Sequence, residues 1–230
     1  MYGNDQIITY LQNNRVLAMK LDHATTGVGQ LINDQIQSIG AGANRVINYL
    51  SCFTDEYYDV CQKQGKEDAR FKDAVFKILQ GKDVVYEMLK VYFDEVLKHK
   101  TNDQLEHIKQ WLMEANVHIA TSSLTKAGFA MAVASSVRIG LNVSMELSAL
   151  AGKRAGGLVG ALGVYGVIQK AADSAHRLHF QFPAYYAALY SEGLEMLYFL
   201  IEPTFIKAHA AEAQWASDRD VIGIIKRMMH

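Results

Sequence analysis

Apolar residues recur every three or four positions along most of the chain, which is the spacing of amphipathic helices. Between Leu31 and Phe53 the apolar positions advance by alternating steps of four and three, as in a helix that packs against another helix. Residues 82–100 place their apolar side chains on one side and most of their Lys and Glu residues elsewhere. No stretch shows the strict alternation of a half-buried strand. The pattern therefore predicts an all-α fold.

Residues that start and stop helices divide this pattern into elements. Thr101 and Gln104 match a capping box, in which each side chain bonds an orphan backbone N–H, and they predict a helix through Leu105, Ile108 and Leu112. The short link before Thr101 favours an antiparallel hairpin with the helix at 82–100.

The stretch that precedes residue 82 is rich in charge. We expect a short helix from Thr54 to near Gly65, a solvated connection over Lys63–Arg70, and a further helix that ends around Gly81. Near the other end of the chain, Pro203 predicts a helix start, and Ser217 or Asp218 predicts the cap of a last short helix.

The composition changes at Ser122. Only four residues between Ala127 and Gln169 are charged, and they are Arg138, Glu146, Lys153 and Arg154. So low a density indicates that this stretch is shielded from water.

The expected organisation is a single helical domain that spans residues 1–230. Amphipathic helices at 1–121 and aromatic-rich helices at 173–230 surround an apolar, glycine-rich helical hairpin at 122–172, which forms the centre of a globular bundle.

The two arms of this hairpin differ in their polar side chains. The first arm, Ala127–Ala151, has a polar stripe whose members lie within about 80° of one another on a helix; they are Ser135, Arg138, Asn142 and Glu146. The second arm, Ala155–Gln169, carries no charge, and the glycines at its start and along it allow a second backbone to approach closely. These packing glycines are Gly152, Gly156, Gly160 and Gly163, and the hairpin tip is Lys153 with Arg154.

Two interpretations of the hairpin stay open. Neither arm is a clean membrane span, which needs about 20 predominantly apolar residues. Arg138 and Glu146 would each add about 2.5 to 3.5 kcal/mol at the bilayer centre, unless the stripe faces a water-filled lumen or a partner. The hairpin is either buried in a soluble bundle or inserts conditionally into a membrane.

A helical chain with 2 Pro and a glycine-rich apolar hairpin at Ala127–Lys170 resembles pore-forming bacterial toxins of the colicin type and ion-conducting effectors delivered by type VI secretion. The resemblance is one of pattern over about 45 of the 230 residues, and the colicin hairpin is more strongly apolar. It implies a secreted antibacterial effector that depolarises a target membrane without catalysis. It also implies an immunity protein in the producing cell and a secretion chaperone.

The C-terminal third supports an alternative from another class, a cytosolic helical adaptor or scaffold without membrane activity. Tyrosine suits protein interfaces and the membrane headgroup zone, although core packing is the commoner use of aromatic rings. The rings in question are Phe180, Phe182, Tyr185, Tyr186, Tyr190, Tyr198 and Phe199.

Charge and cysteine content exclude some partners and indicate a compartment. Lys and Arg number 23 against 24 Asp and Glu, so no broad electrostatic footprint for nucleic acid is expected. Cys52 and Cys61 form no disulfide framework, which predicts buried thiols and synthesis in a reducing compartment. Met1–Asp5 does not begin a signal peptide, so we expect a soluble protein made in the cytoplasm and then secreted by a dedicated machine to insert in a target cell.

Candidate catalytic and metal sites are few. Asp173, His176 and His179 share a helix face and include metal-ligand types, but the same residues suit the polar edge of a helix that ends near Pro183. We favour that second interpretation and predict no metal. Nucleophile-elbow, zinc-protease, Walker and dinucleotide motifs are missing from the sequence, so we expect no enzyme activity and no cofactor.

Overall fold

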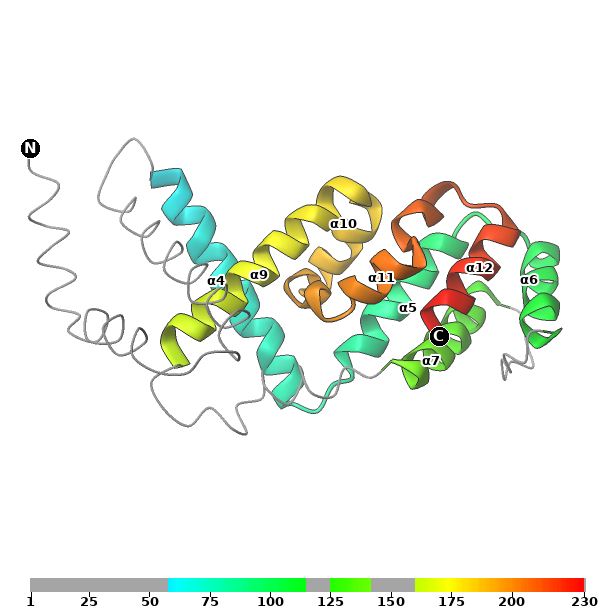
Figure 1. The fold of residues 1–230 in the computed structure, drawn as a ribbon, viewed down its shortest axis with the longest axis horizontal. Coiled ribbons are helices and arrows are strands. Elements are labelled where there is room, and N and C mark those ends of the chain that lie inside the picture. The colour runs from blue at the N-terminus through cyan, green and yellow to red at the C-terminus, as the bar shows by residue number, and fades with distance from the viewer. Residues whose placement is uncertain (1–57, 115–124, 142–159, 230) are drawn as a thin grey trace, which may run out of the picture. The chain divides into compact units, whose positions relative to one another are not determined.

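The computed structural model describes residues 58–114, 125–141 and 160–229, and every regular element in these ranges is a helix (Figure 1). The all-α prediction is confirmed for them. The chain divides into two compact parts, and each is described by itself. Described residues of the first part are 58–68 and 160–170, and those of the second are 69–114, 125–141 and 171–229. One domain over 1–230 stays a prediction.

Helix α4 (Tyr58–Leu79) corrects the expected break at Gly65. Gly65 is exposed and lies within the helix, and the charged run Lys63–Arg70 continues it instead of connecting two helices. A glycine at an exposed helix position costs only about 1 kcal/mol relative to alanine, which does not end a helix of 22 residues. The predicted end at Gly81 is confirmed, since Gly81 adopts a positive φ of 79°.

Helix α5 (Val84–Leu97) is buried at eight of its 14 residues. The Asp83 carboxylate caps it by accepting a 3.0 Å hydrogen bond from the Tyr86 N–H. The predicted apolar stripe is buried, together with further residues around it: Val84, Val85, Met88, Leu89, Tyr92, Phe93, Val96 and Leu97. These side chains pack against α7 (Lys126–Gly140), α10 (Pro183–Ser191) and two 3₁₀ helices, η3 (Glu195–Leu200) and η4 (Ala210–Trp215).

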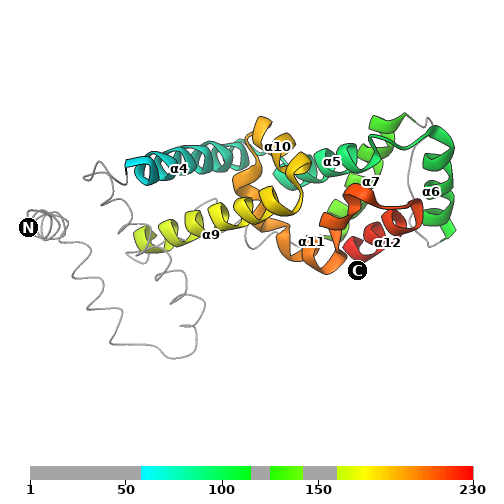
Figure 2. The ribbon, with the colours of Figure 1, turned by 90° about the horizontal axis from the view of Figure 1, so that it is seen from above.

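Helix α6 (Asn102–Glu114) begins at the predicted capping box. Thr101 Oγ1 accepts from the Gln104 N–H at 3.3 Å, and Gln104 Oε1 accepts from the Thr101 N–H at 2.9 Å. The predicted hairpin with α5 is wrong, because α6 packs instead against α7 and α12 (Asp218–Met229). Figure 2 shows α6 and α12 as neighbours at one end of the second part.

The C-terminal helices follow the predicted signals. Pro183 begins α10, and Pro203 lies in the first turn of α11 (Glu202–Ala208). Ser217 caps α12: its Oγ accepts from the Asp220 N–H, while the Asp220 carboxylate accepts from the Ser217 hydroxyl and backbone N–H. These bonds lower the pKa of the Asp220 carboxyl.

Six aromatic rings meet beside α5 and form what we call the aromatic core, namely Tyr92, Phe93, Phe182, Tyr185, Tyr198 and Phe205. Tyr92 is central, with ring centroids 4.7 Å from Phe205 and 5.4 Å from Tyr185. The Tyr92 hydroxyl donates to the Ala210 carbonyl, and the Tyr185 hydroxyl donates to the Met88 carbonyl, each at 2.9 Å. The prediction of core packing is confirmed for Phe182, Tyr185, Tyr198 and Phe199.

The aromatic core makes stability depend on pH in the alkaline range. Burial raises the pKa of Tyr92, Tyr185 and Tyr198 above the ordinary value of about 10. Because the folded pKa lies above the unfolded one, the unfolded chain releases these protons first and the stabilisation is lost as pH rises beyond about 10. We expect the free energy of unfolding in urea to fall between pH 8 and pH 11.

One substitution tests the source of this fall. Tyr185→Phe should make it shallower because one linked proton is removed. A wild-type slope in Tyr185→Phe would contradict the assignment.

Candidate functional site

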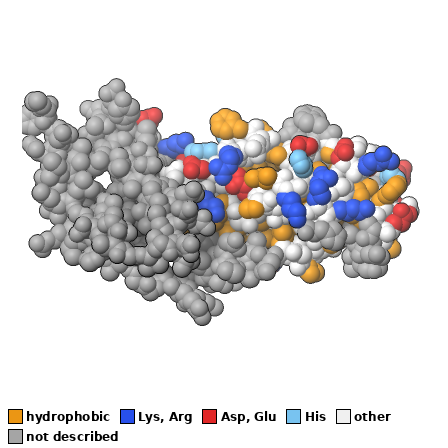
Figure 3. All heavy atoms as spheres, in the orientation of Figure 1, with side chains coloured by type: hydrophobic (Ala, Val, Ile, Leu, Met, Phe, Trp, Pro, Cys, Tyr) orange, Lys and Arg blue, Asp and Glu red, His pale blue; other side chains and the backbone are white. Residues whose placement is uncertain are grey.

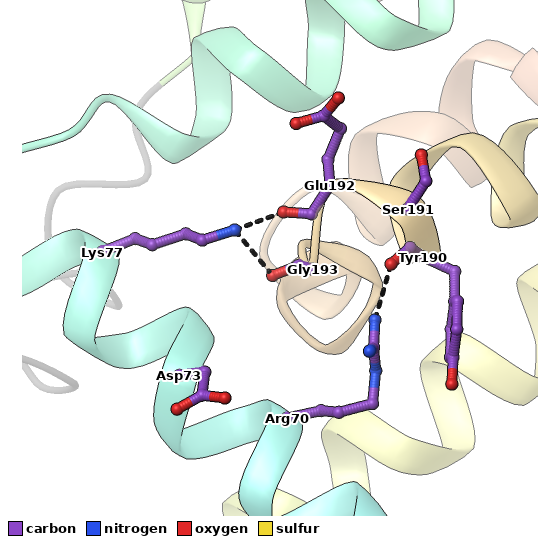
Figure 4. Close-up of a pocket in the computed structure, with 7 residues that line it drawn as sticks. All are labelled: Arg70, Asp73, Lys77, Tyr190, Ser191, Glu192 and Gly193. Atoms are coloured by element: carbon purple, nitrogen blue, oxygen red, sulfur yellow. Dashed lines mark hydrogen bonds between the residues drawn. The ribbon is translucent and has the colours of Figure 1, made fainter.

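An open pocket of about 270 Å³ lies among described residues of the second part (Figure 4). Helix α4 supplies one wall, and the turn that ends α10 supplies the other. The lining residues are Arg70, Asp73, Lys77, Tyr190, Ser191, Glu192 and Gly193.

The end of α10 is shaped by Gly193. Its positive φ of 61° lets the Gly193 N–H bond the Tyr190 carbonyl at 3.1 Å and the Leu194 N–H bond the Leu189 carbonyl at 2.9 Å. The carbonyls of Glu192 and Gly193 consequently face α4, where the Lys77 ammonium donates to both, as Figure 4 shows. A Cβ at Gly193 would lie 3.1 Å from Lys77 Nζ, so glycine also provides the space for this contact.

Arg70 makes the other contact between α4 and this turn. Its guanidinium donates to both oxygens of the Glu195 carboxylate and, at 2.7 Å, to the Tyr190 carbonyl. The guanidinium carbon also lies 3.6 Å from the Tyr190 ring centroid, which is cation–π geometry. The hydrogen bonds that Arg70 donates to the buried Glu195 carboxylate raise the pKa of Arg70.

These contacts explain what the pocket does chemically. The Arg70 charge is matched by Glu195, and Lys77 is held by two carbonyls. The Ser191 hydroxyl donates to the Ala188 carbonyl at 2.8 Å within its own helix. The lining contains neither histidine nor cysteine. The pocket side chains therefore fasten α4 to the α10–η3 turn.

The predicted polar stripe is described only in part. Ser135 and Arg138 lie on α7, where the Ser135 hydroxyl donates to the Met131 carbonyl at 2.9 Å. Arg138 Nε bonds both carboxylate oxygens of Asp83 at 2.9 and 3.0 Å. Gly160 and Gly163 lie in the first turn of α9 (Gly160–Gln181). The other predicted positions fall outside the described residues: Asn142, Glu146, Gly152, Lys153, Arg154 and Gly156.

The candidate metal ligand His179, on α9, takes part in an aromatic contact. The His179 ring stacks on Tyr186 with centroids 4.5 Å apart. Within residues 58–114, 125–141 and 160–229, no three His, Cys, Asp or Glu side chains are grouped to hold a metal ion. Over the same ranges no helix is long and apolar enough to cross a membrane.

The sequence patterns missed two buried acids and misjudged a cysteine. Glu195 pairs with Arg70, which is 125 positions away, and Glu202 accepts two 2.7 Å hydrogen bonds from Arg177. Neither pair has a local signal. Cys61 is disulfide-bonded, so the expectation of a buried free thiol is wrong for this residue, and Cys52 lies outside the described residues.

Comparison of the chain with protein-family models, curated proteins and solved structures finds no match. The geometry of the described residues is therefore the basis for any functional assignment.

The Arg70–Glu195 pair predicts a specific loss of stability. Glu195→Gln leaves the guanidinium without its buried anion, and we expect about 1 to 3 kcal/mol lower stability in urea unfolding, because Arg70 keeps partial access to water. Glu192→Gln makes the same chemical change in the neighbouring exposed side chain and should stay within about 0.5 kcal/mol of wild type. Equal effects of the two variants would argue against the pairing.

Proposed function

We propose that this chain is a secreted antibacterial pore-forming protein, folded in water with its apolar hairpin sheltered and inserted only at a target membrane. The proposed partners are that membrane and a neutralising immunity protein. The observation that carries the proposal is the packing of α7, the described part of the first predicted hairpin arm.

Helix α7 is uncharged from Ala127 to Val137, whereas α4, α5 and α6 each carry several charged residues of both signs. One side is wholly buried and faces α5, α6 and α12. The fully buried side chains are Phe129, Ala130, Val133, Ala134 and Val137. A soluble pore-former needs this kind of cover for the segment that later enters lipid.

The polar contacts that hold α7 are exposed to water. In the Arg138–Asp83 ion pair the two side chains are 28 % and 47 % exposed, so the pair contributes no more than about 1 kcal/mol. At the other end, Lys126 donates to the Lys98 carbonyl at 3.0 Å. Apolar burial therefore supplies most of the attachment, and lipid can replace burial in protein.

The disulfide at Cys61 supports a site of action outside a reducing cytosol, since such bonds persist mainly in oxidising compartments.

A helical adaptor remains the second candidate, and exposed rings of the C-terminal third favour it. Phe180 on α9 is 84 % exposed, and Tyr190 on α10, whose ring contacts Arg70, is 47 % exposed. Exposed aromatic side chains are enriched in protein interfaces. The absence of membrane activity in the following experiment would make this the better assignment.

The pore proposal predicts ion release from vesicles. Purified protein should dissipate an ion gradient across vesicles that contain anionic lipid, at neutral or acidic pH. Asp83→Asn keeps an N-cap acceptor for α5 but removes the charge opposite Arg138, so we expect release about two- to fivefold faster.

Glu87→Gln is the matched control, because it removes one negative charge from the exposed side of the same helix and should keep the wild-type rate. No release by any of the three proteins, and no current when they are added to planar bilayers, would refute the pore function.

A further inference from the structure

We propose that His107 and Trp111 form a proton-sensitive latch on the outer surface of α6; this inference does not depend on the pore function. The two residues lie four positions apart on the helix, so their side chains are neighbours on one side of it. The Trp111 indole N–H donates to Nε2 of His107 at 2.8 Å. The ring centroids are 6.0 Å apart, and the ring planes meet at 82°. The imidazole therefore holds the indole by its N–H edge.

This hydrogen bond requires the neutral form of His107. An indole nitrogen can only donate, so Nε2 of His107 accepts with its lone pair, and the imidazole carries its one proton on Nδ1. A second proton, taken from water, would occupy Nε2, and two N–H groups would then face each other. The bond is therefore lost in the imidazolium form. Because histidine is the side chain that changes charge between about pH 5 and pH 8, mild acid is the expected signal.

The charged groups around the latch belong to α6 and to the two helices that pack against it. On α6, Asp103 and Glu114 are exposed on the same side as His107, while Glu106 and Lys109 pair with each other. Among the residues that the structure describes, no side chain other than Trp111 bonds the imidazole. The charged residues of the packing helices are Lys126 and Arg138 on α7 and Asp218, Arg219, Asp220, Lys226 and Arg227 on α12.

Opening of the latch leaves the packing of α6 in place. The side chains that bury this helix, Leu105, Ile108 and Leu112, are fully covered, whereas His107 is exposed and Trp111 is 43 % exposed. An exposed ring alone is not unusual, since charges of both signs are interspersed with single apolar side chains on the face drawn in Figure 3. Trp111 differs because a titratable group holds it. Protonation thus changes the outer surface of α6 and not its buried side.

Nuclear magnetic resonance of the indole N–H groups tests the latch. The chain has 2 Trp, and Trp111→Phe identifies the Trp111 signal by removing it. In the wild-type protein we expect the proton of this N–H to shift upfield as the pH falls, with a midpoint between about pH 5 and pH 8, because the indole loses its acceptor. In a Trp215→Phe background, acrylamide should quench the Trp111 fluorescence more strongly at the acidic end of this range.

Two substitutions assign the shift to one histidine. His107→Gln replaces the imidazole by an amide that does not titrate, so the Trp111 signal should no longer move with pH. His99→Gln is the matched control, since His99 is an exposed histidine in the turn after α5 and its loss should leave the wild-type midpoint. Circular dichroism and thermal melting establish that each variant is folded.

Several results would overturn the latch. They are a Trp111 signal that stays constant over this pH range in the wild-type protein, an unchanged shift in His107→Gln, and an equal loss of the shift in His99→Gln. Loss of helical signal over the same range would also refute it, because the change must be local. A shift without stronger acrylamide quenching would do so too, since the imidazolium would then keep the ring in a cation–π contact.

Discussion

Helix α5 must be covered along most of its circumference, and the arrangement of the second part follows from that requirement. Eight of its 14 residues are buried. Helix α7 covers it from one region of the sequence, while α10, η3 and η4 cover it from another. Burial of large apolar and aromatic side chains, worth about 1.5 to 3 kcal/mol each, is the main favourable contribution to this packing.

Two tyrosine hydroxyls in the aromatic core restrict how α5 can be covered. A buried hydroxyl without a partner destabilises the fold, so each ring can pack only where its oxygen also reaches an acceptor. Tyr92 satisfies this condition at Ala210 of η4, and Tyr185 satisfies it at Met88 of α5. The buried acids act similarly: Glu195 and Glu202 enter the interior only where Arg70 and Arg177 bond both oxygens of each. Paired buried charges select one arrangement more than they stabilise it.

Features that depend on neighbours three or four positions away were predictable from the sequence. The capping boxes at Thr101 and Ser217, the stripe of α5 and the end of α4 at Gly81 are of this kind. Contacts between segments that are distant in the sequence could not be predicted, because no local pattern indicates them. The sequence therefore marked Arg138 as part of a stripe but gave no sign of Asp83, 55 positions earlier, as its partner.

The same limit explains the mixed outcome in the aromatic segment. A ring-rich sequence predicts burial of rings in general, but Phe180 and Phe182 differ only in which side of the chain they occupy where α9 gives way to α10. Phe182 enters the core, while Phe180 faces solvent. The predicted hairpin of α5 and α6 was wrong for a related reason. A short link permits a hairpin, but α6 packs against α7 and against α12, which follows more than a hundred residues later.

The energetics of α7 bear on the release that the proposed pore function requires. Phe129, Val133 and Val137 are fully buried, and together they contribute on the order of 5 to 9 kcal/mol, several times the value of the exposed Arg138–Asp83 pair. Its last residue also lies against α12, where a Cβ at Gly140 would be 3.3 Å from the Met229 carbonyl oxygen. Loss of the Asp83 charge therefore removes no more than about 1 kcal/mol of this attachment, because water still opposes exposure of the apolar side. The proposed pore function therefore requires a medium that accepts these side chains, so in that proposal contact with lipid precedes release.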